Sequence, residues 1–246
     1  MVANRGTLRW LSWALVICIV ISAGVTLLFV SGILLTPFDI PDFVDRLVAI
    51  RTDNERQFPI VILGSLAALG VYLIGAMLGV LLRAWAQPSP TRDAMTLLLV
   101  TGGVIGIVSQ LLNIGVADAA RPFYCDCGYR PEEVIGLDRA LSVGWSIINW
   151  LLIGAVTFVG VGVAVAARVV QVSSTWRVVS YAIAAGVLIA VAIRVAGSIV
   201  FIEAFDPFQV SDLIIAVSTG ILVPIWAILL SRGVSEPQAP AVAAAV

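Results

Sequence analysis

One charged residue, Arg194, lies inside an apolar stretch that is long enough to cross a lipid bilayer. The stretch covers residues 178–202, and none of the other long apolar runs contains a charge. An arginine at the middle of a spanning helix costs roughly 2.5–3.5 kcal/mol on insertion scales, so it usually faces a protein interior or a wet cavity and pairs with another group. We therefore expect the other helices to enclose Arg194.

Three amide side chains are expected at a depth similar to that of Arg194. Arg194 should lie about 12 Å from the outer end of its helix, at 1.5 Å per residue. Gln110 and Asn113 precede the outer end of the third apolar run, and Asn149 follows the start of the fourth. We interpret these four side chains as one outward-facing pocket that binds a small anionic ligand, a lipid headgroup or a partner helix. The inner halves of the runs are almost wholly apolar, which disfavours a continuous aqueous pore.

A second interpretation of Arg194 needs no ligand. The guanidinium is then neutralised by Asp118, Glu203 or amide carbonyls, and the ion pair serves only to pack the helices. Removing one partner of a buried pair is strongly destabilising, because the other charge stays buried. The two interpretations therefore differ in the expected effect of losing Arg194.

Two cysteines, Cys125 and Cys127, lie in the most elaborate predicted loop, residues 117–139. In an outward loop of a bacterial membrane protein the compartment is oxidising, so they could form a disulfide. With one residue between them the ring would be strained, and strained exposed disulfides exchange readily. This supports an alternative function, an extracytoplasmic thiol-disulfide oxidoreductase. The pair has no nearby histidine, lysine or C-x-x-C motif and falls short of a closed zinc site.

The composition excludes several kinds of chemistry. The sequence contains no histidine, and all 14 of its basic residues are arginine. These absences exclude histidine acid–base or metal chemistry and a lysine Schiff base. The formal net charge is -1 and no basic stripe occurs, which argues against a nucleic-acid partner. We expect no catalytic residues, metal or cofactor, and a non-enzymatic protein; a structural subunit of a larger membrane complex is a further alternative.

The hydropathy of the chain predicts an all-α, polytopic membrane protein. Hydrophobic residues make up 61% of the chain and charged residues 12%, with a mean hydropathy of +1.08; soluble proteins have about 25% charged residues. We expect one membrane domain over residues 1–231 and a disordered cytoplasmic tail over 232–246. The six predicted spans are residues 10–35, 58–82, 94–116, 140–167, 178–202 and 213–230.

Three local patterns refine this bundle. Residues 38–57 carry apolar side chains at helical spacing with charges between them, which predicts a short interfacial helix after the first span. Pro224 should kink the sixth span. Gly75 and Gly79, four residues apart, should allow close helix packing within the subunit.

The charge distribution predicts that both termini are cytoplasmic, in the plasma membrane. Arginines are nearly balanced, but 13 of the 15 acidic residues fall in the predicted outer loops. Tryptophans near the inner boundary fit an interfacial belt. The inner arginines are Arg5, Arg9, Arg83, Arg92, Arg168, Arg177 and Arg232, and the belt tryptophans are Trp10, Trp13, Trp85, Trp176 and Trp226.

Overall fold

The computed structural model describes residues 5–30, 43–120, 131–199 and 207–233, which are helical with short turns and contain no strand. Two short elements accompany the α-helices: η1 is a 3-10 turn, and η3 is a π-helical turn between α6 and α7. Six helical segments are long and apolar enough to cross a membrane, which confirms the predicted all-α polytopic bundle. The elements are α1 (Arg5–Val30), α2 (Phe43–Leu82), η1 (Arg83–Trp85), α3 (Pro90–Ala120), α4 (Pro131–Val169), α5 (Ser174–Ile199), α6 (Pro207–Val217), η3 (Ser218–Leu222) and α7 (Val223–Gly233).

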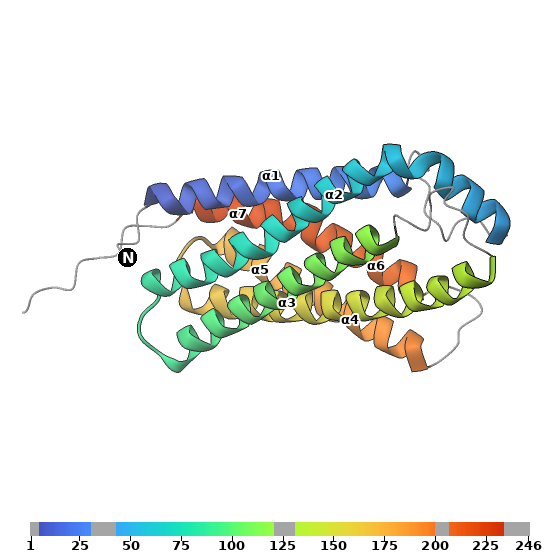
Figure 1. Cartoon of the computed structure of the whole chain (residues 1–246). Coiled ribbons are helices and arrows are strands. Elements are labelled where there is room, and N and C mark those ends of the chain that lie inside the picture. Colours follow the sequence, from blue (N-terminus) through green and yellow to red (C-terminus); the bar gives the residue numbers. More distant parts are fainter. Residues whose placement is uncertain (1–4, 31–42, 121–130, 200–206, 234–246) are drawn as a thin grey trace, which may run out of the picture.

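The spanning helices form a ring in chain order (Figure 1). Each helix packs against the next one in the chain, and α7 closes the ring by packing against α1. Arg5 and Gly233 therefore lie at the same end of the bundle, which we call the terminal end. The opposite end, where residues 31–42, 121–130 and 200–206 connect the helices, is called the loop end.

Two predicted local features of the helices are altered in the structure. The helix expected at residues 38–57 is not a separate element, because α2 continues from Phe43 through the second span to Leu82 with Pro59 inside it. Water at a membrane surface can satisfy a carbonyl that a proline leaves unbonded, so Pro59 does not have to end the helix. In the sixth span, the π-helical turn η3 ends just before Pro224. Proline lacks the N–H that would bond to the carbonyl of Gly220, and a wider turn accommodates this loss.

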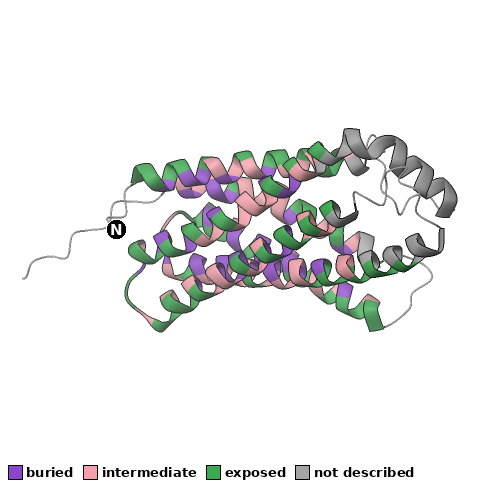
Figure 2. Cartoon of the chain, in the orientation of Figure 1, coloured by how far each residue is buried: buried purple, intermediate pink, exposed green. Residues whose placement is uncertain are grey.

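The packed core lies in the half of the bundle nearer the terminal end (Figure 2). Trp176 and Trp226 are 0% and 3% exposed, and their ring centroids are 5.6 Å apart. The indole Nε1 of Trp226 donates to Ser180 Oγ at 2.9 Å. These two tryptophans therefore do not belong to an exposed belt as predicted, because α5 and α7 turn both rings into the bundle. Trp10 and Trp13 are exposed on α1.

Glycines set the spacing between the central helices. A Cβ on Gly102 would lie 2.9 Å from the carbonyl oxygen of Ala155, so α3 and α4 approach with almost no side chain between them. A Cβ on Gly79 would lie 2.7 Å from Leu99 Cβ, which places Gly79 against α3 within the subunit. Gly75 differs, because a Cβ there would meet no atom within 4 Å. Gly75 instead faces the space inside the ring.

Candidate functional site

A cavity of about 680 Å³ lies inside the ring and is lined by residues from all six spanning segments. Small-molecule sites in proteins typically measure about 300–1,000 Å³. Along α4 the lining extends from Asn149 to Val163, which corresponds to about 21 Å at 1.5 Å per residue. The cavity therefore runs through about two-thirds of a bilayer's hydrocarbon thickness of about 30 Å.

The polar end of the cavity contains an ion pair between α5 and α6. Arg194 Nη1 donates to Oδ1 of Asp212, and both residues line the cavity. Arg194 is 9% exposed, whereas the side chain of Asp212 is 62% exposed. Arg194 lies five residues before Ile199, the end of α5, and Asp212 lies five residues after Pro207, the start of α6. The antiparallel helices thus bring the two charges to the same depth.

The structure pairs Arg194 with Asp212, an acidic residue that the sequence prediction did not name. Asp118 is exposed and makes no ion pair among the described residues, whereas Glu203 lies outside them, so its contact with Arg194 stays a prediction. Asp212 was missed because the hydropathy pattern starts the sixth span at residue 213. The helix itself starts at Pro207, a residue type that favours the first helical position, so Asp212 lies in the second turn of α6.

The predicted amides fall into two groups. Gln110 and Asn149 line the cavity with Arg194. Gln110 is 6% exposed, and its side chain has no hydrogen-bond partner in the described part of the chain. Asn113 does not line the cavity: its Nδ2 donates to Ser65 Oγ at 3.0 Å and joins α3 to α2. A ligand-binding role stays a prediction for all four residues.

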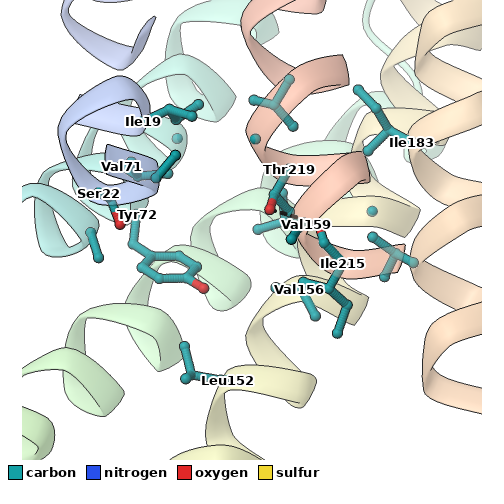
Figure 3. Close-up of a pocket in the computed structure, with 18 of the residues that line it drawn as sticks. Ile19, Ser22, Val71, Tyr72, Leu152, Val156, Val159, Ile183, Ile215 and Thr219 are labelled. Atoms are coloured by element: carbon teal, nitrogen blue, oxygen red, sulfur yellow. Dashed lines mark hydrogen bonds between the residues drawn. The ribbon is translucent and has the colours of Figure 1, made fainter. Parts of the chain in front are cut away.

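A second group of polar side chains lies deeper in the cavity and was not predicted. Tyr72 reaches from α2 into the open space (Figure 3), and its hydroxyl has no hydrogen-bond partner within the described ranges. A Cβ on Gly106 would lie 2.2 Å from the Tyr72 ring, so this glycine makes room for it. Ser22 on α1 and Thr219 on η3 also line the cavity, and Thr219 donates to the carbonyl of Ile215 at 2.7 Å. When an apolar run contains a single hydroxyl residue, the sequence alone does not show whether that side chain faces the cavity.

The lining nearest the terminal end is apolar, and that end of the cavity is closed. Between the hydroxyl groups and the terminal end, the cavity is bounded by aliphatic side chains and one indole. The packed core lies immediately beyond them. No continuous polar path therefore leads through the described part of the bundle. The apolar end is lined by Leu15, Leu78, Leu99, Val163, Ile183 and Trp226, and the core beyond it includes Leu8, Leu82, Met95 and Leu230.

The cavity opens sideways between α1 and the α6–η3 segment. Leu27 of α1 and Ile221 of η3 line the cavity, yet they are 65% and 55% exposed. Val217 of α6 shares both properties. These residues belong to segments that are long and apolar enough to span a membrane.

Neither the cysteines nor a cluster of possible metal ligands forms part of this site among the described residues. Cys125 and Cys127 lie outside the described residues, so their pairing stays a prediction. Cys18 is a free, half-buried thiol on α1. Within the described ranges, no group of three or more histidine, cysteine or acidic side chains comes together.

No protein-family model, curated protein sequence or solved structure matches the chain. Function lies in sites rather than in folds, so a function has to be inferred from the size, lining and charges of the cavity. The cavity combines one ion pair, two amides and four hydroxyl side chains (Ser22, Thr26, Tyr72 and Thr219) with a long apolar end. This combination suits a ligand that is itself polar at one end and apolar along its length.

Proposed function

We propose that the protein is an integral membrane protein that binds one lipid-like amphiphile in the cavity. The headgroup lies at Arg194 and the acyl chain extends toward Trp226. The observation that carries the proposal is the gradient of the lining, from the Arg194–Asp212 ion pair through hydroxyl groups to aliphatic side chains. Binding is the activity that this lining supports.

The length and lining of the cavity favour an amphiphile over a small anion. A small anion would occupy only the polar end and leave the apolar end unfilled. An acyl chain fills that end with apolar contacts, as close packing in protein interiors requires.

The sideways opening supports the same ligand class. A lipid could move from the bilayer into the cavity between α1 and η3 without carrying its chain through water. Exposing a chain to water costs about 0.8 kcal/mol for each CH₂ group, so a route through hydrocarbon avoids a large barrier. The apolar residues Leu27 and Ile221 at the opening fit this route.

We propose in addition that the protein is a multi-pass protein of the plasma membrane with both termini in the cytoplasm. The orientation rests on the acidic residues, since 13 of the 15 fall in the predicted outer loops. At the terminal end Arg83 and Arg92 share Asp93 at 3.0 and 3.1 Å. A reporter fused at Arg92 should report the cytoplasm, and one fused near Tyr129 should report the exterior. An exterior signal at Arg92 reverses the orientation.

Photo-crosslinking tests the location of the bound lipid. Purified protein is incubated with lysophospholipids that carry a diazirine at the end of the acyl chain, irradiated, and mapped by peptide mass spectrometry. We expect labelling at Leu78 and Trp226, which line the apolar end. Labelling confined to outward-facing residues such as Val178 and Leu213, which are 66% and 65% exposed, would show that lipid only surrounds the protein.

A further inference from the structure

We propose that the ligand headgroup is zwitterionic and combines an anion with an ammonium group that carries N–H bonds, as phosphoethanolamine does. This inference rests on the proposed function and specifies the ligand class of the same site. It follows from the two opposite charges at the polar end of the cavity, Arg194 and Asp212.

The carboxylate of Asp212 has the geometry of a second binding group. Arg194 Nη1 donates to its Oδ1, while the side chain remains 62% exposed. An ionised carboxylate offers about four lone-pair positions on two oxygens, so it can accept from a ligand while it keeps the arginine contact. A guanidinium carries five N–H donors in a planar fork, which suits a phosphate oxygen as well as a carboxylate.

The same carboxylate selects against headgroups that lack a positive charge. A purely anionic headgroup placed on Arg194 would lie beside the negative charge of Asp212, and the repulsion between like charges would weaken its binding relative to a headgroup that also carries a positive charge. A quaternary ammonium carries a positive charge but no N–H, so it cannot donate a hydrogen bond to Asp212. A primary ammonium satisfies both the charge and the hydrogen-bond requirement.

The amide of Gln110, which lines the same cavity as the ion pair, is a second and separate indication of a ligand. The Gln110 side chain is more than nine-tenths buried, lines the cavity and has no hydrogen-bond partner within the described residues. An amide in a largely apolar cavity gains free energy when a ligand supplies the hydrogen bonds that the protein does not. Phosphate and ester oxygens of a phospholipid are acceptors that this amide can bind, and Asn149 offers a second amide on the same cavity.

Lipid competition tests the headgroup class. Wild-type protein in nanodiscs is titrated with phosphatidylethanolamine, phosphatidylglycerol and phosphatidylcholine of identical acyl chains, and each competes with the diazirine lysophospholipid for labelling of Trp226. We expect phosphatidylethanolamine to compete about tenfold better than either other lipid, since one charge-assisted hydrogen bond corresponds to about a tenfold change. In Asp212→Asn, which keeps an oxygen for Arg194, this preference over phosphatidylglycerol should disappear.

The outcomes separate the headgroup inference from the proposed function. If phosphatidylglycerol or phosphatidylcholine competes as well as phosphatidylethanolamine in the wild type, the headgroup inference is wrong while lipid binding stands. If none of the lipids reaches Trp226, both are wrong. The wild-type ranking decides the question even if Asp212→Asn cannot be purified folded.

Discussion

Replacing Arg194 by leucine is expected to remove most lipid retention while the protein stays folded. The change removes a charge from a spanning helix, where an arginine is unfavourable. The carboxylate that it leaves behind, Asp212, has a side chain that is 62% exposed, so it stays solvated. Half-exposed ion pairs contribute about 1 kcal/mol or less, and we expect stability in detergent to change by no more than that.

The binding effect of the same change should be large. Hydrogen bonds to charged groups contribute about 1.5–3 kcal/mol, which corresponds to a loss of roughly 10- to 100-fold in lipid affinity. Arg194→Lys should lose binding as well, because an ammonium is a point donor and cannot replace a planar fork. Arg177→Leu is the matched control, since Arg177 is exposed near the terminal end and does not line the cavity. Lipid retention is measured by native mass spectrometry and stability by thermal unfolding.

Two results would count against a ligand-binding role for Arg194. Unchanged retention in Arg194→Leu would show that the headgroup lies elsewhere. A marked loss of folded protein would assign Arg194 to helix packing, the alternative that the sequence leaves open. The exposed side chain of Asp212 changes how this alternative is tested, because the carboxylate of Asp212 is not left buried when the arginine is removed. Binding therefore separates the two roles better than stability does.

The membrane topology can be read from simple features of the sequence. Runs of about 20 apolar residues predict the six spans, because only helices of that length satisfy their backbone groups across a bilayer. The depths of Arg194, Gln110 and Asn149 are predictable as well, because every residue of a helix advances it by 1.5 Å. These three residues line one cavity.

Depth along a helix does not determine which way a side chain faces. Asn113 lies one turn beyond Gln110 on α3, yet it points to Ser65 of α2 and away from the cavity. Trp176 and Trp226 show the same limitation, because their positions near the membrane surface fit a belt while their rings pack in the core. The direction of each side chain is set by helix packing, which the hydropathy pattern does not contain.

The hydropathy pattern did not predict Asp212 as a partner of Arg194, because Asp212 lies one residue before the predicted start of the sixth span. A charged residue ends an apolar run in any hydropathy profile, so Asp212 is assigned to the loop although α6 starts at Pro207. The position of Arg194 near the end of α5 could have indicated Asp212 as its partner. In two antiparallel helices, residues that are equally far from the connecting loop lie at the same depth. An acid near the start of the next helix is thus a natural candidate for such a partner.

Filling the cavity from Gly75 is expected to expel the lipid without disturbing the fold. Gly75 lies in α2 on the cavity wall, and a Cβ there would meet no atom within 4 Å. Leucine or tryptophan at this position can therefore grow only into the open volume. Glycine inside a helix is about 1 kcal/mol less favourable than alanine, so the folded protein should be as stable as the wild type or slightly more stable.

Gly154→Leu provides the matched control for this substitution. Gly154 also lies inside a spanning helix, α4, and a Cβ there also meets no atom within 4 Å. It does not line the cavity. The control therefore carries the same gain in helix propensity and side-chain volume, and it differs only in where the new side chain points.

Counting retained phospholipids in the Gly75 series is the most direct test of the central claim, that an amphiphile occupies the cavity. Native mass spectrometry in mild detergent should show one tightly held lipid per protein in the wild type and in Gly154→Leu. Gly75→Leu should reduce retention about tenfold or more, a loss of about 1.4 kcal/mol, and Gly75→Trp should abolish it. Full retention in folded Gly75→Trp would contradict lipid binding in this cavity.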